Sequence, residues 1–487
     1  MNIKLSVHVI GIFLKFFGLF LLIPAVISLI YRDGDLYIFL LTASLTSLIG
    51  YILERITIEC KHISVMERKD AFFIAFLCWI VACLIGAVPY FLVPLPAFSH
   101  PVDAIFESIS GFTTTGATIV TDIEDLPHGI LFYRSFTQWL GGMGIVVLGI
   151  AILPKLSVGG IQLMGSESPG PIMEKITPKI AETAKKLWLV YITLSLIMII
   201  CLYISGMPFF DSIVTSFSTL STGGFSVRNA SIESYNSPLI ESIITVFMFL
   251  GGISFLLHYY VFTGKFSKVI RNSEIKFYLL ITVIFIFAIS INLWSHQYLN
   301  YLEALRYSSF QVVSILTTTG FSSTDFDLWP YFSIFLLIIM MFIGACAGST
   351  SGSIKNLRIL ILIKKVFSRE INHLIKPHAV LLIKINTKPV NEEVLSSVTS
   401  FFVLYILIFI LSTLLILAVE DISILGALSA CAASIGNVGP GFVEVGATHN
   451  YEFLSSFSKL WLCFLMILGR LELFTIIVIF SPMFWRR

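Results

Sequence analysis

Four short segments rich in threonine, serine and glycine recur along the chain, and their residue types could build a cation site. They are Phe112-Thr-Thr-Thr-Gly-Ala-Thr118, Leu220-Ser-Thr-Gly-Gly-Phe-Ser226, Leu316-Thr-Thr-Thr-Gly-Phe-Ser322 and Ile435-Gly-Asn-Val-Gly-Pro-Gly441. Glycine adopts backbone angles that are closed to other residues, so successive carbonyl oxygens can face the same way. A ring of such oxygens can replace the water shell of a cation. The four segments therefore predict a four-part cation site made of backbone oxygens.

The aligned glycines of these segments are about 100 to 120 residues apart: Gly116, Gly223, Gly320 and Gly439. In the fourth segment Gly436 is an alternative anchor, but Asn-Val-Gly aligns better with Thr-Thr-Gly. A short run precedes each glycine, as at Ala104–Phe112 and Ile213–Leu220. Such a run is too short to cross a bilayer but suits a re-entrant helix, whose partly negative C-terminal end would favour a cation.

Small residues also serve as helix-packing positions in membranes, which is the competing interpretation of these glycines. That interpretation fits Gly141-Gly142-Met-Gly144 and Gly251-Gly252, and we prefer it there. It does not explain why each of the four segments follows a helix too short to span.

The composition requires a membrane setting for these elements. Of 487 residues, 57% are apolar and only 12% charged, whereas about a quarter of an ordinary soluble chain is charged. Apolar spans flank each short helix, and two more precede all four units, which gives about ten crossings. The predicted spans are Val7–Ile30, Leu36–Leu53, Ala71–Val93, Ile130–Leu153, Leu187–Ser205, Leu239–Phe262, Phe277–Trp294, Tyr331–Val366, Val394–Val419 and Phe457–Phe480.

Basic residues cluster in alternate loops, and the outer loops between them are acidic or neutral. The clusters are Arg55–Lys69, Lys155–Lys186, Lys265–Lys276, Lys355–Lys388 and Arg486–Arg487. The positive-inside rule places these loops and both termini in the cytoplasm. Between membrane spans the clusters do not predict nucleic-acid binding. Cysteines such as Cys78, Cys83, Cys201 and Cys463 lie in apolar spans and are interpreted as small buried hydrophobes.

At the four glycine segments the sequence resembles the Trk/Ktr/HKT superfamily of potassium transporters, over essentially the full length. The extra N-terminal pair of spans and the Gly439-Pro440-Gly441 ending favour the Trk-type membrane subunit. The resemblance implies an all-α integral membrane protein with four M1–pore-helix–M2 repeats around one pore plus two N-terminal helices. The expected divisions are 1–68 for the N-terminal pair, then repeats at 69–180, 181–272, 273–388 and 389–487.

By this resemblance the filter carbonyls belong to four triplets, which carry potassium ions and no other metal. They are Thr114, Thr115, Gly116, Ser221, Thr222, Gly223, Thr318, Thr319, Gly320, Asn437, Val438 and Gly439. In the superfamily a glycine at the first filter accompanies potassium selectivity, and a serine accompanies sodium transport in some plant members. Gly116 therefore implies potassium, although the residues alone leave potassium and sodium open.

The third repeat contains Gly344-Ala-Cys-Ala-Gly-Ser-Thr-Ser-Gly-Ser353, which interrupts a long span. Small residues with three glycines are poor helix formers, so we expect a break near mid-membrane. In the family this segment is the gating loop; a small-residue packing face is the alternative. The spacing does not match a nucleotide-binding loop. The expected gate residues are Gly344, Gly348, Ser349, Thr350, Ser351, Gly352 and Arg470.

Arg470 lies inside the last span, where an arginine usually faces a partner or water. The resemblance suggests that it reaches the gating loop and holds the closed state, with snorkelling toward the cytoplasm as the alternative. Glu472 is two positions away and is a poor helical partner for it. Lys459 and Arg134, near outer ends of spans, are interpreted as snorkelling or surface charges.

The expected function is potassium uptake across the bacterial cytoplasmic (inner) membrane by a non-enzymatic, multi-pass protein without a bound cofactor. The family implies a homodimer, contact with lipid and a cytosolic nucleotide-binding regulatory subunit (TrkA-like). Lys364, Lys365 and Arg369 are candidate docking residues for that subunit. The alternatives are a sodium-dependent potassium or sodium transporter of the Ktr type, the pore subunit of a pumping complex, and a membrane enzyme, whose clustered polar residues are not found in these loops. Whether flux is channel-like or a symport stays open.

Overall fold

The computed structural model describes residues 2–58, 68–144, 180–296, 300–375, 378, 381–386 and 388–486. Within them the chain is mainly helical, with one antiparallel hairpin of β1 (Lys384–Ile385) and β2 (Lys388–Pro389). Six helices are long and apolar enough to cross a membrane, or up to eight if each of two bent pairs counts as one span. The all-α membrane fold is confirmed. The number of about ten spans stays a prediction, since the end of the predicted span Ile130–Leu153 lies outside the described residues.

The helices fall into an N-terminal group and four similar units. The N-terminal group is α1 (Ile3–Phe20), α2 (Leu22–Tyr31) and α3 (Leu36–Ile56). The first unit has α4 (Arg68–Leu92), η2 (Pro96–Phe98), α5 (Pro101–Phe112) and α6 (His128–Gly142). The second has α9 (Ile180–Ile204), α10 (Phe209–Leu220), η4 (Ser231–Tyr235), α11 (Pro238–Gly251), α12 (Phe255–Phe262) and α13 (Phe266–Ile270).

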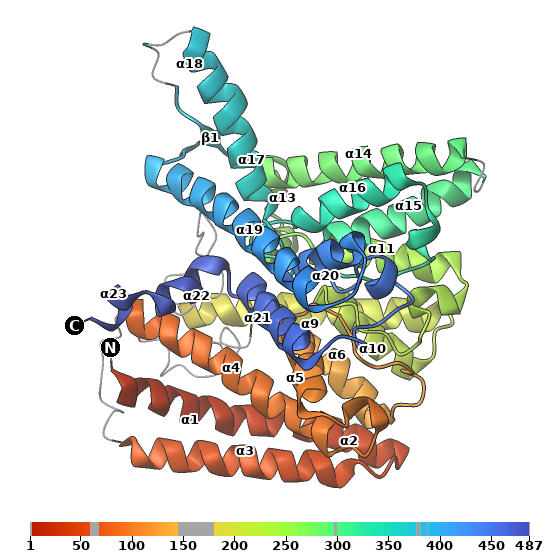
Figure 1. Cartoon of the computed structure of the whole chain (residues 1–487), viewed down its shortest axis with the longest axis vertical. Coiled ribbons are helices and arrows are strands. Elements are labelled where there is room, and N and C mark those ends of the chain that lie inside the picture. Colours follow the sequence, from red (N-terminus) through yellow and green to blue (C-terminus); the bar gives the residue numbers. More distant parts are fainter. Residues whose placement is uncertain are drawn as a thin grey trace.

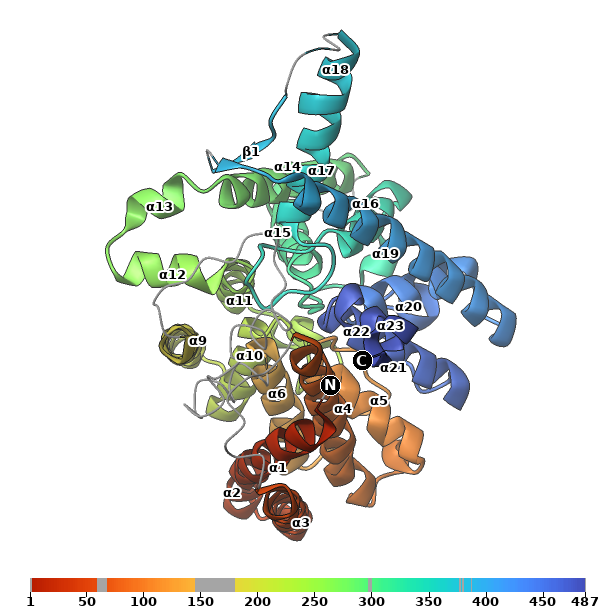
Figure 2. The same ribbon diagram turned by 90° about the vertical axis from the view of Figure 1, so that its left-hand side faces the viewer.

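The third unit has α14 (Ser273–Ser295), α15 (Tyr301–Leu316), η5 (Phe326–Leu328), α16 (Tyr331–Phe342), α17 (Asn356–Lys364), η6 (Lys365–Glu370) and α18 (Ile371–Ile375). The fourth has α19 (Glu392–Val419), α20 (Ile424–Gly436), η7 (Val443–Val445), α21 (Ser456–Arg470), α22 (Leu473–Phe480) and α23 (Pro482–Trp485). In Figure 2 the four units follow one another around a common centre, and the N-terminal group lies outside the first unit.

The predicted short helices are α5, α10, α15 and α20, with 12, 12, 16 and 13 residues. At about 1.5 Å per residue none can cross a hydrocarbon core of about 30 Å. Start signals in the sequence set their first turns: Pro101 is the first residue of α5, and the side chains of Asn300 and Ser423 cap α15 and α20. Each short helix ends at the first or second residue of one of the glycine segments.

Two spans that the sequence predicted as continuous are sharply bent. The predicted span Leu239–Phe262 consists of α11 and α12 at 102°, and Phe457–Phe480 consists of α21 and α22 at 114°. At the first bend the carbonyl of Gly252 bonds outside its own helix. This carbonyl accepts a hydrogen bond from the amide of Cys346 at 3.0 Å. The predicted break within Tyr331–Val366 is present, because α16 ends at Phe342 and α17 begins at Asn356.

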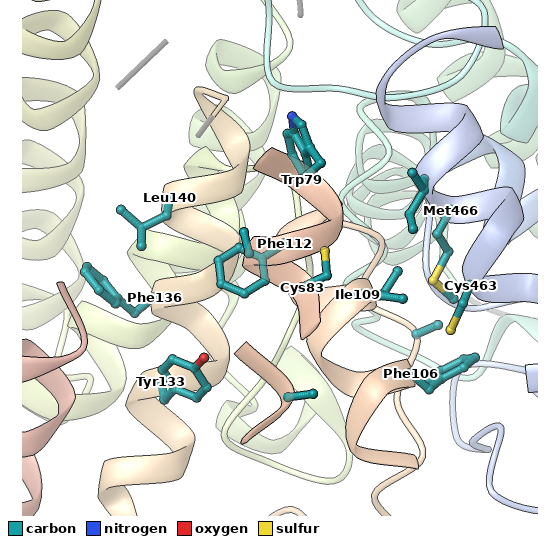
Figure 3. Packing of buried hydrophobic residues seen from close by; sticks show 14 of the residues in the cluster. Trp79, Cys83, Phe106, Ile109, Phe112, Tyr133, Phe136, Leu140, Cys463 and Met466 are labelled. Carbon is teal, nitrogen blue, oxygen red and sulfur yellow. The ribbon is translucent and has the colours of Figure 1, made fainter. Parts of the chain in front are cut away.

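The largest hydrophobic cluster joins the first unit to the fourth. Figure 3 shows Phe106 and Ile109 of α5 beside Cys463 and Met466 of α21, all of them buried. Cys83 is also buried here, which agrees with its interpretation as a small hydrophobe. Gly141 confirms its predicted packing role, because a Cβ there would lie 1.9 Å from the carbonyl oxygen of Phe112.

The two described ends of the chain lie beside the start of α4. The amide of Asn2 donates to Asp70 Oδ1 at 2.8 Å, and Lys69 Nζ donates to the carbonyl of Arg486 at 3.2 Å. Figure 1 shows both termini at the same side of the molecule, with α18 projecting away from the body. Most of the predicted basic loop Lys155–Lys186 lies outside the described residues.

Candidate cation pathway

The four glycine segments meet in a closed ring. A Cβ on each ring glycine would collide with a carbonyl oxygen of the next unit, 2.6 Å away or less. The pairs run in order: Gly116 with Gly223, Gly224 with Thr319, Gly320 with Val438, and Gly439 with Thr115. These glycines have φ between 78° and 102°, and the residue two positions before each has φ between 54° and 60°. The left-handed backbone at these positions lets each ring glycine lie against the equivalent carbonyl of the neighbouring unit.

The ring corrects the predicted alignment of the second unit by one residue. Gly224, with φ 78°, occupies the place of Gly116, Gly320 and Gly439, whereas Gly223 has no positive φ. Gly223 instead matches Thr115, since both amides donate to the carbonyl five residues earlier. The triplet of this unit is therefore Thr222–Gly224 and not Ser221–Gly223. Two consecutive glycines left the choice open, and the threonine register of the other segments favours the second one.

The side chains that support the ring make different hydrogen bonds in different units. The hydroxyls of Thr113 and Thr115 lie 2.8 Å apart, and those of Thr317 and Thr319 repeat this contact at the same distance. In the fourth unit Asn437 Nδ2 instead donates to Thr115 Oγ1 at 3.0 Å and to the carbonyl of Met466 at 2.8 Å. The departure of Asn437 from the threonine pattern thus links the fourth unit to the first.

A cavity of about 110 Å³ opens on one side of the ring, and we call it the outer cavity. Its lining includes all four ring glycines: Gly116, Gly224, Gly320 and Gly439. The predicted Gly223 does not line it, which agrees with the corrected alignment.

The 344–353 loop lies against the ends of three short helices. Thr350 Oγ1 donates to the carbonyl of Leu220 at 3.0 Å, and Ser353 Oγ donates to that of Gly436 at 3.1 Å. The amide of Gly352 donates to Thr318 Oγ1 at 2.7 Å. Gly352 needs its missing side chain, since a Cβ would lie 2.2 Å from the carbonyl oxygen of Gly436. The loop therefore contacts three of the four units, and none of its residues lines the outer cavity.

Arg470 reaches this loop, as predicted. Its guanidinium donates to the carbonyls of Thr350, Gly141 and Gly142 at 2.6 to 2.7 Å. Beyond the loop lies a cavity of about 230 Å³, the inner cavity, whose lining includes Gly348, Ser351, Gly352, Lys355 and Arg470. The geometry thus orders an outer cavity, a ring of oxygens, a loop held by an arginine and an inner cavity.

Two charges that the sequence placed at the surface are buried in ion pairs. Arg134 is 1% exposed, and its Nε lies 2.8 Å from Oε1 of the fully buried Glu107. The guanidinium of Arg134 also lies 4.2 Å from the ring of Phe225, next to Gly224. Lys459 Nζ lies 2.6 Å from Asp103 Oδ1, with both side chains at least nine-tenths buried. A buried charge needs a partner, and no spacing in the sequence identifies Glu107 or Asp103 as that partner.

The sequence model of the TrkH family, described as "Cation transport protein", matches residues 53–487. The chain belongs to the TrkH family. It is 40% identical to the Trk system potassium uptake protein TrkH of Salmonella typhimurium over 491 residues, covering 100% of both chains. It is also 40% identical to the TrkH protein of Halomonas elongata over 490 residues, again covering 100% of both.

A solved structure matches equally well. The crystal structure of the potassium transporter TrkH from Vibrio parahaemolyticus superposes with a TM-score of 0.89 at 36% identity, covering 100% of both chains. The predicted Trk-type membrane subunit is confirmed as the class of this protein, and it is a multi-pass membrane protein of the TrkH family.

Proposed function

We propose that this TrkH-family protein takes up potassium through the ring of four triplets. The observation that carries the proposal is the closed cycle of glycine–carbonyl contacts that opens directly on the outer cavity. The relatives that match this chain over their full length are named potassium uptake proteins. A ring of carbonyl oxygens suits a weakly hydrated monovalent cation, which exchanges its water shell for these oxygens.

The proposed filter comprises Thr114–Gly116, Thr222–Gly224, Thr318–Gly320 and Asn437–Gly439. Potassium is the transported substrate. By the resemblance, Gly116 supports potassium over sodium. A serine at this position would place its side chain against the carbonyl oxygen of Gly223.

The divisions 1–68, 69–180, 181–272, 273–388 and 389–487 remain the proposed units of the chain.

The proposed gate is the 344–353 loop together with Arg470. The loop supports this role because its hydroxyls and the Gly352 amide bond to the inner ends of three units, where a leaving ion would pass. The three hydrogen bonds of Arg470 hold the loop in place. Breaking these bonds would open the route to the inner cavity.

The proposal also covers the membrane, the orientation and the partners of the protein. We place it in the bacterial inner membrane with both termini in the cytoplasm, consistent with the shared position of Asn2 and Arg486 beside α4. A homodimer and a TrkA-like cytosolic subunit follow from the resemblance. Of the candidate docking cations, Lys365 Nζ lies 3.0 Å from Thr399 Oγ1 and Arg369 lies 2.6 Å from Glu392. A partner on this surface would therefore compete with contacts inside the chain.

The test is flux of potassium and of sodium into liposomes that hold the purified chain. We expect potassium-preferring flux, which Gly116→Ser relaxes toward sodium. Gly206→Ser is the matched control, because Gly206 also has positive φ, 94°, but has open space around it. Equal flux of both ions in the unmodified chain would overturn potassium selectivity, and a potassium flux that requires sodium would favour the Ktr-type alternative.

A further inference from the structure

An ion pair connects the third unit to the fourth beside the proposed gate. Arg358 lies in α17, directly after the 344–353 loop, and Glu472 lies at the bend between α21 and α22. Their side chains form a salt bridge and are 8% and 13% exposed. The guanidinium of Arg358 also lies 4.0 Å from the centre of the Phe401 ring. The pair therefore joins two elements that bound the inner cavity.

The backbone of Glu472 is strained. Its φ of 59° and ψ of 141° lie in a region that glycine adopts and a glutamate rarely does. Such a conformation persists only where surrounding contacts impose it. The bend of 114° at this residue turns α22 away from α21. Glu472 forms its ion pair with Arg358 in this backbone conformation.

The bend places the cation of Arg470 and the carboxylate of Glu472 against two different parts of the proposed gate. Arg470 faces the middle of the loop at Thr350, while Glu472 faces the helix that follows the loop. Two further charges face the same region: Lys355 donates to the carbonyl of Ser351, and Glu274 Oε1 accepts from the amide of Ala347 at 2.6 Å. The charged frame thus contains three cations and two carboxylates, so the loss of Glu472 raises its formal excess of positive charge from one to two.

We propose that Arg358 and Glu472 form a second latch of the gate, which must part before the loop can move. This inference rests on the proposed gating role of the loop and adds two positioning residues to it. When the latch parts, α17 is released from the fourth unit and the backbone of Glu472 can relax. The same conformation that strains the closed state therefore favours opening once the pair is broken.

The test measures potassium and sodium flux of Glu472→Gln, Arg358→Gln, their double variant and the exchanged pair Arg358→Glu with Glu472→Arg. Each single neutralisation should raise potassium flux of the isolated chain by about tenfold, the size of a typical coupling between two sites. The double variant should resemble the singles, and the exchanged pair should lower flux again. The ratio of potassium to sodium flux should stay unchanged, because the ring is untouched.

Two controls separate a latch from a general structural contact. Arg358→Lys keeps the charge and should keep flux near that of the unmodified chain. Lys15→Gln with Glu54→Gln removes another ion pair, of 2.6 Å, in the N-terminal helices and should leave flux unchanged. Unchanged or reduced flux in both singles, or an exchanged pair as open as the singles, would overturn the latch. The latch could be overturned while Arg470→Gln still conducts potassium selectively in the same assay. In that case the proposed function would stand.

Discussion

The amide of Gly352 donates a hydrogen bond of 2.7 Å to the hydroxyl of Thr318, so the proposed gate and the proposed filter share a direct bond. Both residues are buried. The state of the loop and the state of the third triplet are therefore connected without any intermediate residue.

Removal of this hydroxyl should loosen the loop. Thr318→Val keeps the shape of the side chain but leaves the Gly352 amide without its partner, which costs about 1–3 kcal/mol in a buried setting. Potassium flux of the isolated chain should rise several-fold, while Thr318→Ser should keep it low. Flux measured in liposomes checks this, and equal flux in the two variants would disprove the connection.

The corrected alignment predicts unequal effects at two adjacent glycines. Gly224→Ala places a methyl group 1.9 Å from the carbonyl oxygen of Thr319 and forces an alanine to a φ of 78°. Gly223→Ala meets the side chain of Gln138 and has no positive φ. We expect the first variant to lose potassium selectivity and the second to retain most of it, in the two-ion flux assay. The opposite order would give Gly223, and not Gly224, the place that Gly116, Gly320 and Gly439 hold in the ring.

The buried pair of Arg134 and Glu107 should be essential for stability. Arg134→Ala leaves a fully buried carboxylate unpaired and should cost about 3–5 kcal/mol. Replacing both residues, as Arg134→Met with Glu107→Leu, should cost much less because no charge is left alone. Thermal unfolding in detergent measures both, and a double variant as unstable as the single one would contradict this account.

Asp327 gives a pH dependence. Burial in the outer loop raises the pKa of its carboxyl from 3.8 to about 6, despite a hydrogen bond from the backbone of Val443. The folded state therefore binds this proton more tightly than the unfolded state, and stability should fall as the pH rises from about 4 to about 6. After allowance for solvent screening we expect about 1 kcal/mol.

Asp327→Asn should flatten this dependence, measured as the unfolding temperature across that range. Asp122→Asn, in a different outer loop, is the matched control and should leave the dependence as it is. A wild-type slope in Asp327→Asn would assign the effect to other groups.

Local signals predicted most of the fold. The short helices follow from their length and from start residues such as Pro101 and Asn300, and the break after Phe342 follows from its glycines. The bend at Glu472 could not be predicted, because a glutamate carries no local signal for positive φ. Its conformation depends on contacts such as the pair with Arg358, which lies 114 residues away.

The site was predicted less completely than the fold. Threonine and glycine types revealed the triplets, but the register at Gly223 and Gly224 depends on contacts with the third unit. The partner of Lys459 is Asp103, 356 residues away, and no period or spacing connects them. A charge inside an apolar span indicates that a partner exists. Which residue is the partner depends on how the units pack around the closed ring.

The ring closes only where Gly439 meets Thr115, between the last unit and the first. During synthesis the first three units are made before the fourth, which supplies the last side of the ring. Lys459 reaches Asp103, and Asn437 reaches Thr115, only when the C-terminal helices arrive. A growing chain thus lacks the closed ring until its C-terminal helices arrive, and the 344–353 loop of the proposed gate has been made before that ring can close.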